Sequence, residues 1–369
     1  MNIKIVAALM LGSLCIGARA ADSPRAAGST SENMQPALRA AAQAGIGRGL
    51  QYLRARQGSD GAFSHSVGIT GLVMRGFAES RGAPLPTDAA LLGSAAEFML
   101  KQAKPDGAMS ESAENRSYNT SLALGALAAT KNEKYRAALN KGRAFLQGQQ
   151  FDEGEGYTPK HRYYGGVGYG DDGVFPDMAN QFIALDALRA ASLNPQDATW
   201  KKALIFISRA QNRSESNDQK FAGNDGGFIY MPGANVAPFK GTESYGGITA
   251  AGLMSLLFAG ADKHDPRVVA AYNWIKKNYT LDTNPGTGVK DGIFYYYYAF
   301  AQAMSAMGEV EVVDAKGLKH NWRDELANKL LSLQSPDGSW VNKDSPRWMQ
   351  SNPDLVSGWA INALNFALK

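Results

Sequence analysis

The chain has 369 residues, of which 44% are hydrophobic and 20% charged, and its formal net charge at pH 7 is +4. A chain of this length can build either one large domain or two ordinary ones. So small a net charge argues against nucleic acid as a partner. Cys15 is the only cysteine, so intramolecular disulfides and thiolate metal sites are excluded.

The N-terminus has the pattern of a secretory signal peptide, residues 1–20. Lys4 precedes a short apolar run, and the run ends at Ala18-Arg19-Ala20, which is a typical cleavage site. Because the run is too short to cross a bilayer comfortably, we expect cleavage after Ala20 rather than a retained anchor. No later stretch is long and apolar enough to cross a membrane. The sequence therefore predicts a periplasmic or secreted protein with no transmembrane anchor after cleavage.

The rest of the chain divides into a lead-in and one domain. Residues 21–37 are rich in Ser, Ala and Gly, and we expect a flexible segment there. In residues 38–369 one pattern recurs six times: an amphipathic helix, a turn containing Gly, and a second, more apolar helix. The turns contain Asp60-Gly61, Asp106-Gly107, Glu155-Gly156, Asp225-Gly226, Pro285-Gly286 and Asp337-Gly338. Gln57, Gln102, Gln149, Gln211 and Gln334 end or follow the first helix in five of the copies.

The second helices align without gaps, and each has an apolar residue seven positions after the aligned one. The aligned residues are Thr70, Thr120, Met178, Thr249, Tyr297 and Ser357. A helix pair of this kind cannot bury its own apolar face, so we expect an array of mutually packed pairs. Six pairs can close into a ring, with the first helices outside and the second helices lining the centre. The predicted fold class is therefore all-α, built from six helical-hairpin repeats.

Two segments carry a resemblance to a known superfamily. Gln334 to Trp340 reads QSPDGSW, and Tyr164 to Gly170 is a Gly-rich loop that leads into Phe175-Pro176-Asp177-Met178-Ala179. Together with the repeat, they resemble the squalene cyclase and protein prenyltransferase beta-subunit superfamily. The resemblance covers essentially the whole chain after the signal peptide. It implies an alpha/alpha six-barrel toroid with a central hydrophobic cavity.

Both active sites of that superfamily are incomplete in this chain. The resemblance places the last Asp of the cyclase Asp-x-Asp-Asp stretch on Asp177, but the proton-donating position falls on Pro176, which has no proton to donate. It places the zinc-binding Asp of the prenyltransferases on Asp291, whereas Ile293 and Val356 stand where Cys and His would be. We therefore expect no metal and no cofactor. The sequence does not decide whether the chain is an enzyme.

Acidic, amide and aromatic residues at the starts of the second helices are the candidates for a site. The catalytic candidates are Asp177, Asp171, Asp172 and Tyr118, and the ligand-binding candidates are Asn119, Asn180, Tyr245, Tyr295, Tyr297 and Tyr298. Most of them also have a structural interpretation. Asp177 suits the positive end of a helix, Asp171 and Asp172 lie in a Gly-rich turn, and the aromatic run 294–298 can be core packing.

These residues predict a function for an exported ring. We expect it to bind, with or without chemistry, an apolar or isoprenoid-like ligand in an aromatic central cavity, so its partner is an apolar or amphipathic small molecule. The alternative is a polysaccharide-processing, lyase-like enzyme, because residues 114–119 weakly resemble the Asn-x-Ser-Tyr segments of polysaccharide lyases, with Arg116 in place of a commonly present His. A noncatalytic protein-interaction ring is a third hypothesis, which a large exposed apolar patch would favour.

Overall fold

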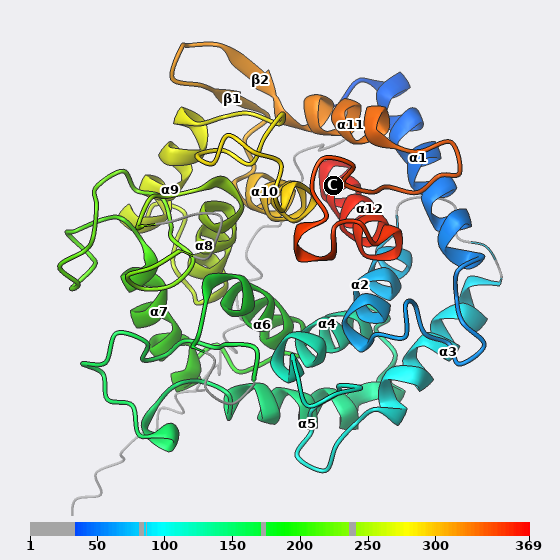
Figure 1. Ribbon diagram of the computed structural model, residues 1–369, viewed down its shortest axis with the longest axis horizontal. Coiled ribbons are helices and arrows are strands. Elements are labelled where there is room, and N and C mark those ends of the chain that lie inside the picture. The colour runs from blue at the N-terminus through cyan, green and yellow to red at the C-terminus, as the bar shows by residue number, and fades with distance from the viewer. Residues whose placement is uncertain (1–33, 81–84, 86, 171–174, 236–240) are drawn as a thin grey trace, which may run out of the picture. The chain divides into compact units, whose positions relative to one another are not determined.

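The computed structural model describes residues 34–80, 85, 87–170, 175–235 and 241–369. All of them belong to one compact unit, and the predicted signal peptide, residues 1–20, lies outside the described residues. The unit is mostly helical, with twelve α-helices and one small antiparallel hairpin (Figure 1). No described helix combines the length and the hydropathy that a membrane span requires.

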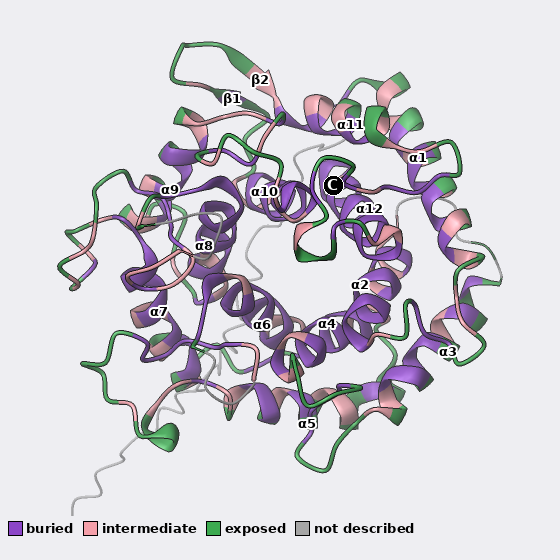
Figure 2. Cartoon of the chain, viewed as in Figure 1, coloured by how far each residue is buried: buried purple, intermediate pink, exposed green. Residues whose placement is uncertain are grey.

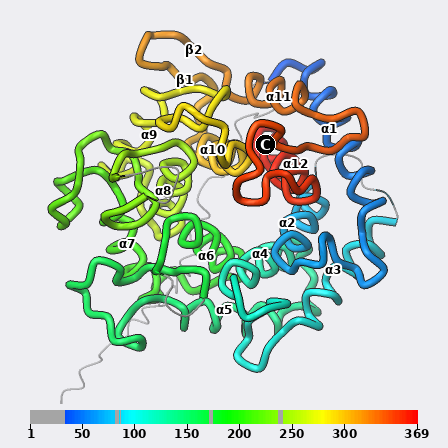
Figure 3. Tube along the Cα trace, in the orientation of Figure 1, coloured from blue at the N-terminus to red at the C-terminus, as the bar shows by residue number. Residues whose placement is uncertain are grey.

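The helices form two sets that alternate along the chain, one outside and one inside (Figures 1 and 3). The outer set is α1 (Pro36–Arg54), α3 (Asp88–Lys101), α5 (Arg136–Gln147), α7 (Ala198–Ala210), α9 (Pro266–Lys277) and α11 (Trp322–Leu333). The inner set is α2 (Val67–Ala78), α4 (Arg116–Ala129), α6 (Met178–Ala190), α8 (Gly246–Phe258), α10 (Ile293–Met307) and α12 (Pro353–Ala367). The strands β1 (Glu311–Val313) and β2 (Lys319–Asn321) lie between α10 and α11.

Composition decides which helices lie inside. The outer helix α5 buries only Gly142, Phe145 and Leu146, as expected of an amphipathic helix that covers a core with one stripe. In the inner helix α12 every residue from Asp354 to Ala367 is buried. Figure 2 shows the same contrast for the two sets as a whole. A helix that is apolar on all sides must be surrounded by protein, so the predicted division into first and second helices is confirmed.

Contacts between the inner helices run through the set in chain order and return to its start. α2 contacts α4, and the same holds for α4 with α6, α6 with α8, α8 with α10 and α10 with α12. α12 in turn contacts α2, the first inner helix. In the outer set α1 contacts α11, which brings the two ends of the helical part together.

The recurring glutamine explains how successive helix pairs are joined. Its amide donates two hydrogen bonds, one to the glycine carbonyl of its own turn and one to a carbonyl at the next outer helix. Gln211, for example, donates to Gly226 at 2.9 Å and to Arg267 of α9 at 2.8 Å. Gln57, Gln150 and Gln334 make the equivalent pairs. Gln334 reaches Gly45 of α1, so the last copy is joined to the first as the others are joined to their successors.

The turn glycine allows the turn to approach the next outer helix closely. Gly338 has φ +91°, and a Cβ there would lie 2.5 Å from the carbonyl oxygen of Arg48 in α1. Gly226 has φ +85°, and its Cβ would lie 2.7 Å from the Ala270 oxygen in α9. Both the positive φ and the lack of space require glycine, which is why the Asp-Gly pair recurs in the sequence.

The third copy corrects the sequence alignment in three places. Its glutamine is Gln150 rather than Gln149, and its turn glycine is Gly165 rather than Gly156, because Gln150 donates to Gly165 at 3.0 Å. In four copies the hydroxyl of the aligned Thr or Ser accepts from a backbone N–H beyond the turn, and these residues are Thr70, Thr120, Thr249 and Ser357. In the third copy Gln181 accepts that bond from Val167 at 2.8 Å, so Met178 was aligned three residues too early.

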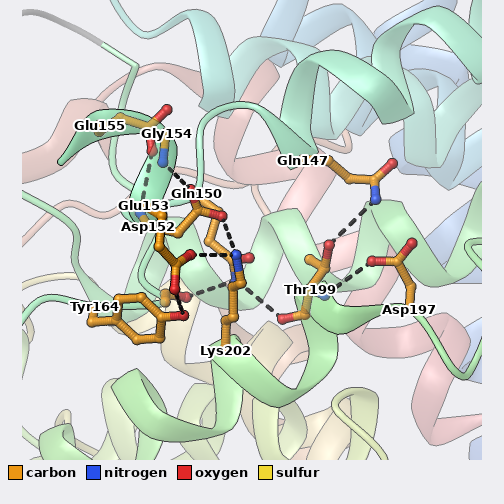
Figure 4. A network of polar contacts seen from close by, with 11 residues as sticks. Gln147, Gln150, Asp152, Glu153, Gly154, Glu155, Tyr164, Asp197, Thr199 and Lys202 are labelled. Carbon is orange, nitrogen blue, oxygen red and sulfur yellow. Dashed lines mark hydrogen bonds and ion pairs between the residues drawn. The ribbon is translucent and has the colours of Figure 1, made fainter. Parts of the chain in front are cut away.

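A polar network surrounds this third junction (Figure 4). Lys202 of α7 lies 2.7 Å from Asp152 Oδ2 and 2.7 Å from Glu153 Oε2, and the Tyr164 hydroxyl donates to Glu153 Oε1 at 2.8 Å. Gln150 donates to the Thr199 carbonyl in the same place. Because these contacts join the third helix pair to the fourth on the outer side, we assign the network to the scaffold.

Candidate functional site

The helix α6 begins at an aspartate that caps it. Asp177 Oδ1 accepts the backbone N–H groups of Ala179 and Asn180, each at 2.9 Å. The side-chain amide of Asn180 donates to Oδ2 at 2.7 Å, and the Tyr230 hydroxyl also hydrogen-bonds to the carboxylate. The interpretation of Asp177 as a helix cap is therefore confirmed.

The same carboxylate is a buried charge. Asp177 is 1% exposed. Burial raises its pKa to about 6, although hydrogen bonds from Asn180, Tyr230 and Ala179 oppose the shift. Within the described ranges no Lys, Arg or His side chain forms an ion pair with it. At neutral pH Asp177 is therefore a buried negative charge that hydrogen bonds and the positive end of α6 compensate, with no cation among the described residues.

Tyrosines surround Asp177. We name Tyr118, Tyr169, Tyr230, Tyr245 and Tyr295 the tyrosine cluster. Burial raises the pKa of four of them, Tyr118, Tyr230, Tyr245 and Tyr295, and the charge of Asp177 adds to each shift. All but Tyr245 keep intermediate exposure. Side chains that are enclosed by protein and still partly exposed are those expected to line an interior space.

An aromatic layer lies next to this cluster. Phe182 of α6 is 6.4 Å from Tyr295 and 6.0 Å from Tyr298, both of α10, measured between ring centroids. Trp359 of α12 is 4.8 Å from Tyr298 and 5.7 Å from Tyr295. Because α8 lies between α6 and α10 in the order of contacts, the Phe182 contacts cross the interior. We name Phe182, Tyr295, Tyr298 and Trp359 the aromatic layer.

Beyond this layer an ion-pair network also crosses the interior. Arg75 of α2 pairs with Asp186 of α6, and its Nε lies 2.8 Å from Glu79 Oε1. Burial lowers the pKa of Arg75, but the charges of Asp186, Tyr298 and Glu79 and the hydrogen bond to Asp186 together outweigh it and raise that pKa well above its usual range. The Tyr298 hydroxyl also hydrogen-bonds to Asp186. Alternate helices α2, α6 and α10 thus meet through polar groups.

Sequence reasoning missed this network, Tyr230, and two members of the aromatic layer. Arg75 and Asp186 lie far apart in the sequence and on helices that are not neighbours. The available signal was weak: Arg75 is the one charged residue of the apolar helix α2, whereas Asp186 shares α6 with Arg189 and two amide residues. Phe182 and Trp359 looked like any apolar residue of an inner helix, because no pattern distinguishes an interior-facing ring from one that packs between helices.

The other predicted residues lie elsewhere or have local partners. The Tyr297 hydroxyl donates to the Leu281 carbonyl at 2.7 Å, which is the contact of a core residue. Asn119 is buried, and its amide donates to Ser110 at 3.0 Å and to Glu111 at 3.3 Å. Asp171 and Asp172 lie outside the described residues.

The surroundings of Arg116 bear on the lyase alternative. Its guanidinium pairs with Asp106 and lies over the ring of Phe145, 5.1 Å from the centroid. Asp106 belongs to the turn before α4, and Phe145 belongs to the outer helix α5. No observation therefore brings Arg116 beside Tyr118 and Asn119 as a catalytic group.

The described residues form no metal-ligand group, and their outer pockets lie away from the tyrosine cluster. In the part of the chain that the structure describes, no group of three or more His, Cys, Asp or Glu side chains could hold a metal ion. A pocket of 420 Å³ lies between α1 and the 336–338 turn, and one of 240 Å³ lies beside α7. Neither pocket is lined by a residue of the tyrosine cluster or the aromatic layer.

No protein-family model and no curated protein matches the chain. Among solved structures, a variant of the type II terpene cyclase MstE from Scytonema with its product merosterolic acid A matches 90% of this chain and 98% of its own, with a TM-score of 0.56 and 14% identity. The fold is squalene cyclase-like. Another MstE variant, with its substrate geranylgeranyl dihydroxybenzoate, matches 90% of this chain and 99% of its own (TM-score 0.56, 13% identity). A protein from Actinoplanes matches 89% of this chain and 100% of its own, with a TM-score of 0.53 and 17% identity.

The squalene cyclase-like fold agrees with the resemblance that the sequence indicated. At such low identity the likeness concerns the fold alone, since fold does not determine function. What this chain does must be argued from its own interior residues.

Proposed function

We propose that this chain is an exported alpha/alpha six-barrel toroid that binds an apolar or isoprenoid-like ligand among its inner helices. Two observations support the six-barrel: the inner-helix contacts return from α12 to α2, and Gln334 joins the last helix pair to α1. Export is supported by the signal-peptide pattern of residues 1–20.

The observation that carries the binding proposal is the aromatic layer beside the tyrosine cluster. Phe182, Tyr298 and Trp359 are each at most 2% exposed and come from three different inner helices. Next to them Tyr118, Tyr169, Tyr230 and Tyr295 remain partly exposed. Apolar aromatic walls with a few polar groups are typical of small-molecule sites. The MstE structures are consistent with this, because they hold an isoprenoid substrate or product.

The proposal is for binding, because the described residues of the site show no free carboxyl group. Pro176 occupies the position that would donate. Burial raises the pKa of Asp177 to about 6, but both of its carboxylate oxygens already accept hydrogen bonds, which oppose protonation.

Mass spectrometry of an organic extract tests the proposal. We expect protein purified gently from its native envelope compartment to yield a stoichiometric isoprenoid or other lipid, absent from a denatured and washed aliquot. A protein that carries no lipid, and that binds no member of a panel of isoprenoid alcohols in titration, contradicts the proposal.

Two variants one turn or less apart on α10 provide the matched control. Tyr295→Leu removes a ring from the interior wall, so we expect retained lipid to fall about fivefold or more with little change in Tm. Tyr297→Leu removes the bond to Leu281, so we expect a lower Tm and unchanged lipid per folded protein. If Tyr295→Leu instead lowered Tm and left the retained lipid unchanged, Tyr295 would be a core residue and would not line the proposed binding site.

A further inference from the structure

The charge balance around Asp177 leaves one group uncompensated. The Arg75, Glu79 and Asp186 network pairs its own charges. Asp177 has hydrogen-bond donors but, within the described residues, no cation. The positive end of α6 offsets only about half of an elementary charge. About half a negative charge therefore remains in a buried aromatic setting.

Two further polar groups there lack partners. Asn180 is 2% exposed, and its Nδ2 donates to Asp177, yet its Oδ1 is buried and has no hydrogen-bond partner among the described residues. The Tyr295 hydroxyl is also buried and has no hydrogen-bond partner among the described residues. An unpaired buried acceptor costs free energy. The free amide oxygen therefore favours a ligand that brings N–H donors.

The rings beside Asp177 suit the same kind of ligand. Aromatic faces attract cations through their quadrupole, and the attraction is stronger in a site from which water is excluded. Tyr118, Tyr230, Tyr245 and Tyr295 are all close enough to Asp177 for its charge to act on them. Carboxylate, free amide oxygen and aromatic faces together match a protonated amine rather than a neutral alcohol or an acid.

We infer that the space beside Asp177 takes the ammonium head of an amphipathic amine, whose apolar tail lies against the aromatic layer. This inference rests on the proposed function and narrows its ligand class. The carboxylate supplies the charge, Asn180 Oδ1 accepts an N–H, and the tyrosine cluster encloses the head. Tyr295, the member of the aromatic layer that remains partly exposed, contacts the tail.

Titration with three ligands of one chain length tests the inference: farnesylamine, farnesol and farnesoic acid, followed by calorimetry. For the wild-type protein we expect farnesylamine to bind at least about tenfold more tightly than farnesol, because a charge-assisted bond and cation–π contacts are added. Farnesoic acid should bind weakest, since its carboxylate meets Asp177. Equal binding of amine and alcohol overturns the inference but leaves the proposed function standing. Failure of all three to bind overturns both.

Asp177→Asn is the decisive variant, because Asn also caps helices well and keeps a side-chain oxygen for the backbone donors. We expect it to reduce the amine-to-alcohol affinity ratio to about one while farnesol binding persists. Asp291→Asn is the control: Asp291 lies just before α10 but has Arg347 at 3.9 Å, so the ratio should stay at its wild-type value. If the amine-to-alcohol affinity ratio of Asp177→Asn stays at the wild-type value, other residues cause the preference for the amine and the inference is overturned.

The wild-type protein gives a second measurement that does not depend on the variant folding. The groups that face Asp177 are Asn180 and the tyrosines, whose raised pKa values keep them neutral near pH 7, while a primary amine stays protonated. The amine-to-alcohol ratio should therefore rise between pH 5 and pH 7.5 as Asp177 ionises. A ratio that does not change with pH contradicts the assigned role of this carboxylate.

Discussion

At the residue scale, Asp177 combines two demands that oppose each other. As a cap it must accept the first N–H groups of α6, which favours the anion. As a residue that is 1% exposed it loses hydration, which favours the neutral acid. Its pKa, raised to about 6, shows that burial outweighs the hydrogen bonds. In the absence of ligand this position should therefore cost the protein stability at neutral pH.

That cost predicts how stability changes with pH. The folded-state pKa of Asp177 is about 6 and its ordinary value is 3.8, so between these values the folded chain keeps a proton that the unfolded chain releases. The contribution of Asp177 to the unfolding free energy therefore falls as pH rises through this window, by about 3 kcal/mol in total. Below pH 3.8 both states are protonated, and the contribution no longer changes.

Comparison with Asp177→Asn isolates this contribution from other titrating carboxylates. We expect the unfolding free energy of the variant, relative to wild type, to increase from pH 4 to pH 7 in urea titrations, because only the wild type pays to ionise a buried group. If the difference in unfolding free energy between variant and wild type stayed constant across this range, Asp177 would be ionised throughout. That is the result expected if its hydrogen bonds outweighed its burial.

Sequence reasoning reached some residues of the site and could not reach others, for a physical reason. Asp177 and Asn180 could be predicted because a helix start is a local event with local chemistry. The pairing of Arg75 with Asp186 could not, since it depends on which residues of two non-adjacent helices face the same interior. Tyr295 and Tyr297 differ only by rotation about one helix, and an uninterrupted aromatic run hides which of them faces inward.

At the element scale, a glutamine joins successive helix pairs in four copies. Adjacent residues of the third copy provide a comparison. Gln150 is 2% exposed and donates to the Gly165 and Thr199 carbonyls. Replacing it with Met removes both hydrogen bonds and leaves the buried Gly165 carbonyl without this partner, so we expect Gln150→Met to lower the unfolding free energy by about 2–3 kcal/mol.

Gln149→Met is the matched control for that loss. Gln149 is only partly buried, and its bonds to Gly148 and Ser117 are long, 3.4 Å and 3.5 Å. We expect a change within about 0.5 kcal/mol, measured by urea titration with an unchanged m-value. Equal losses for the two variants would mean that the third joint does not depend on this amide.

The third copy also shows where a repeat alignment fails. The spacing of Gln, Gly and a following apolar residue identified the joining glutamine in three copies, at Gln57, Gln211 and Gln334, and it predicted the all-α architecture. In the third copy, as in the fourth, 15 residues separate the glutamine from its turn glycine. In the third copy this segment also contains its own turn at Glu153–Glu155. Glu155-Gly156 resembles the Asp-Gly pair of the other turns, so the sequence pattern placed the turn glycine of this copy at Gly156. Only the contact with α7 distinguishes the true glycine, and no local pattern records it.

At the scale of the whole molecule, the contacts of α12 with α2 determine how the array should unfold. In an open array the terminal repeats have one neighbour each and fray first. Here Asn362 of α12 donates to the Leu72 carbonyl of α2 at 3.1 Å, and Asn365 donates to Gly76 at 3.3 Å. If the proposed ring is closed, the first and last repeats have as many neighbours as any others.

Native-state amide hydrogen exchange measures this directly. We expect amides of α2 and α12 to be as protected as those of α6 and α8, because opening either end would expose the same buried interfaces as opening the middle. Gln334→Met, which breaks the bond to Gly45, should lower protection in α1, α2 and α12 together by about tenfold or more. Exchange that is fastest at α2 and α12 in the wild-type protein would indicate an open array, and the six-barrel proposal would then be wrong.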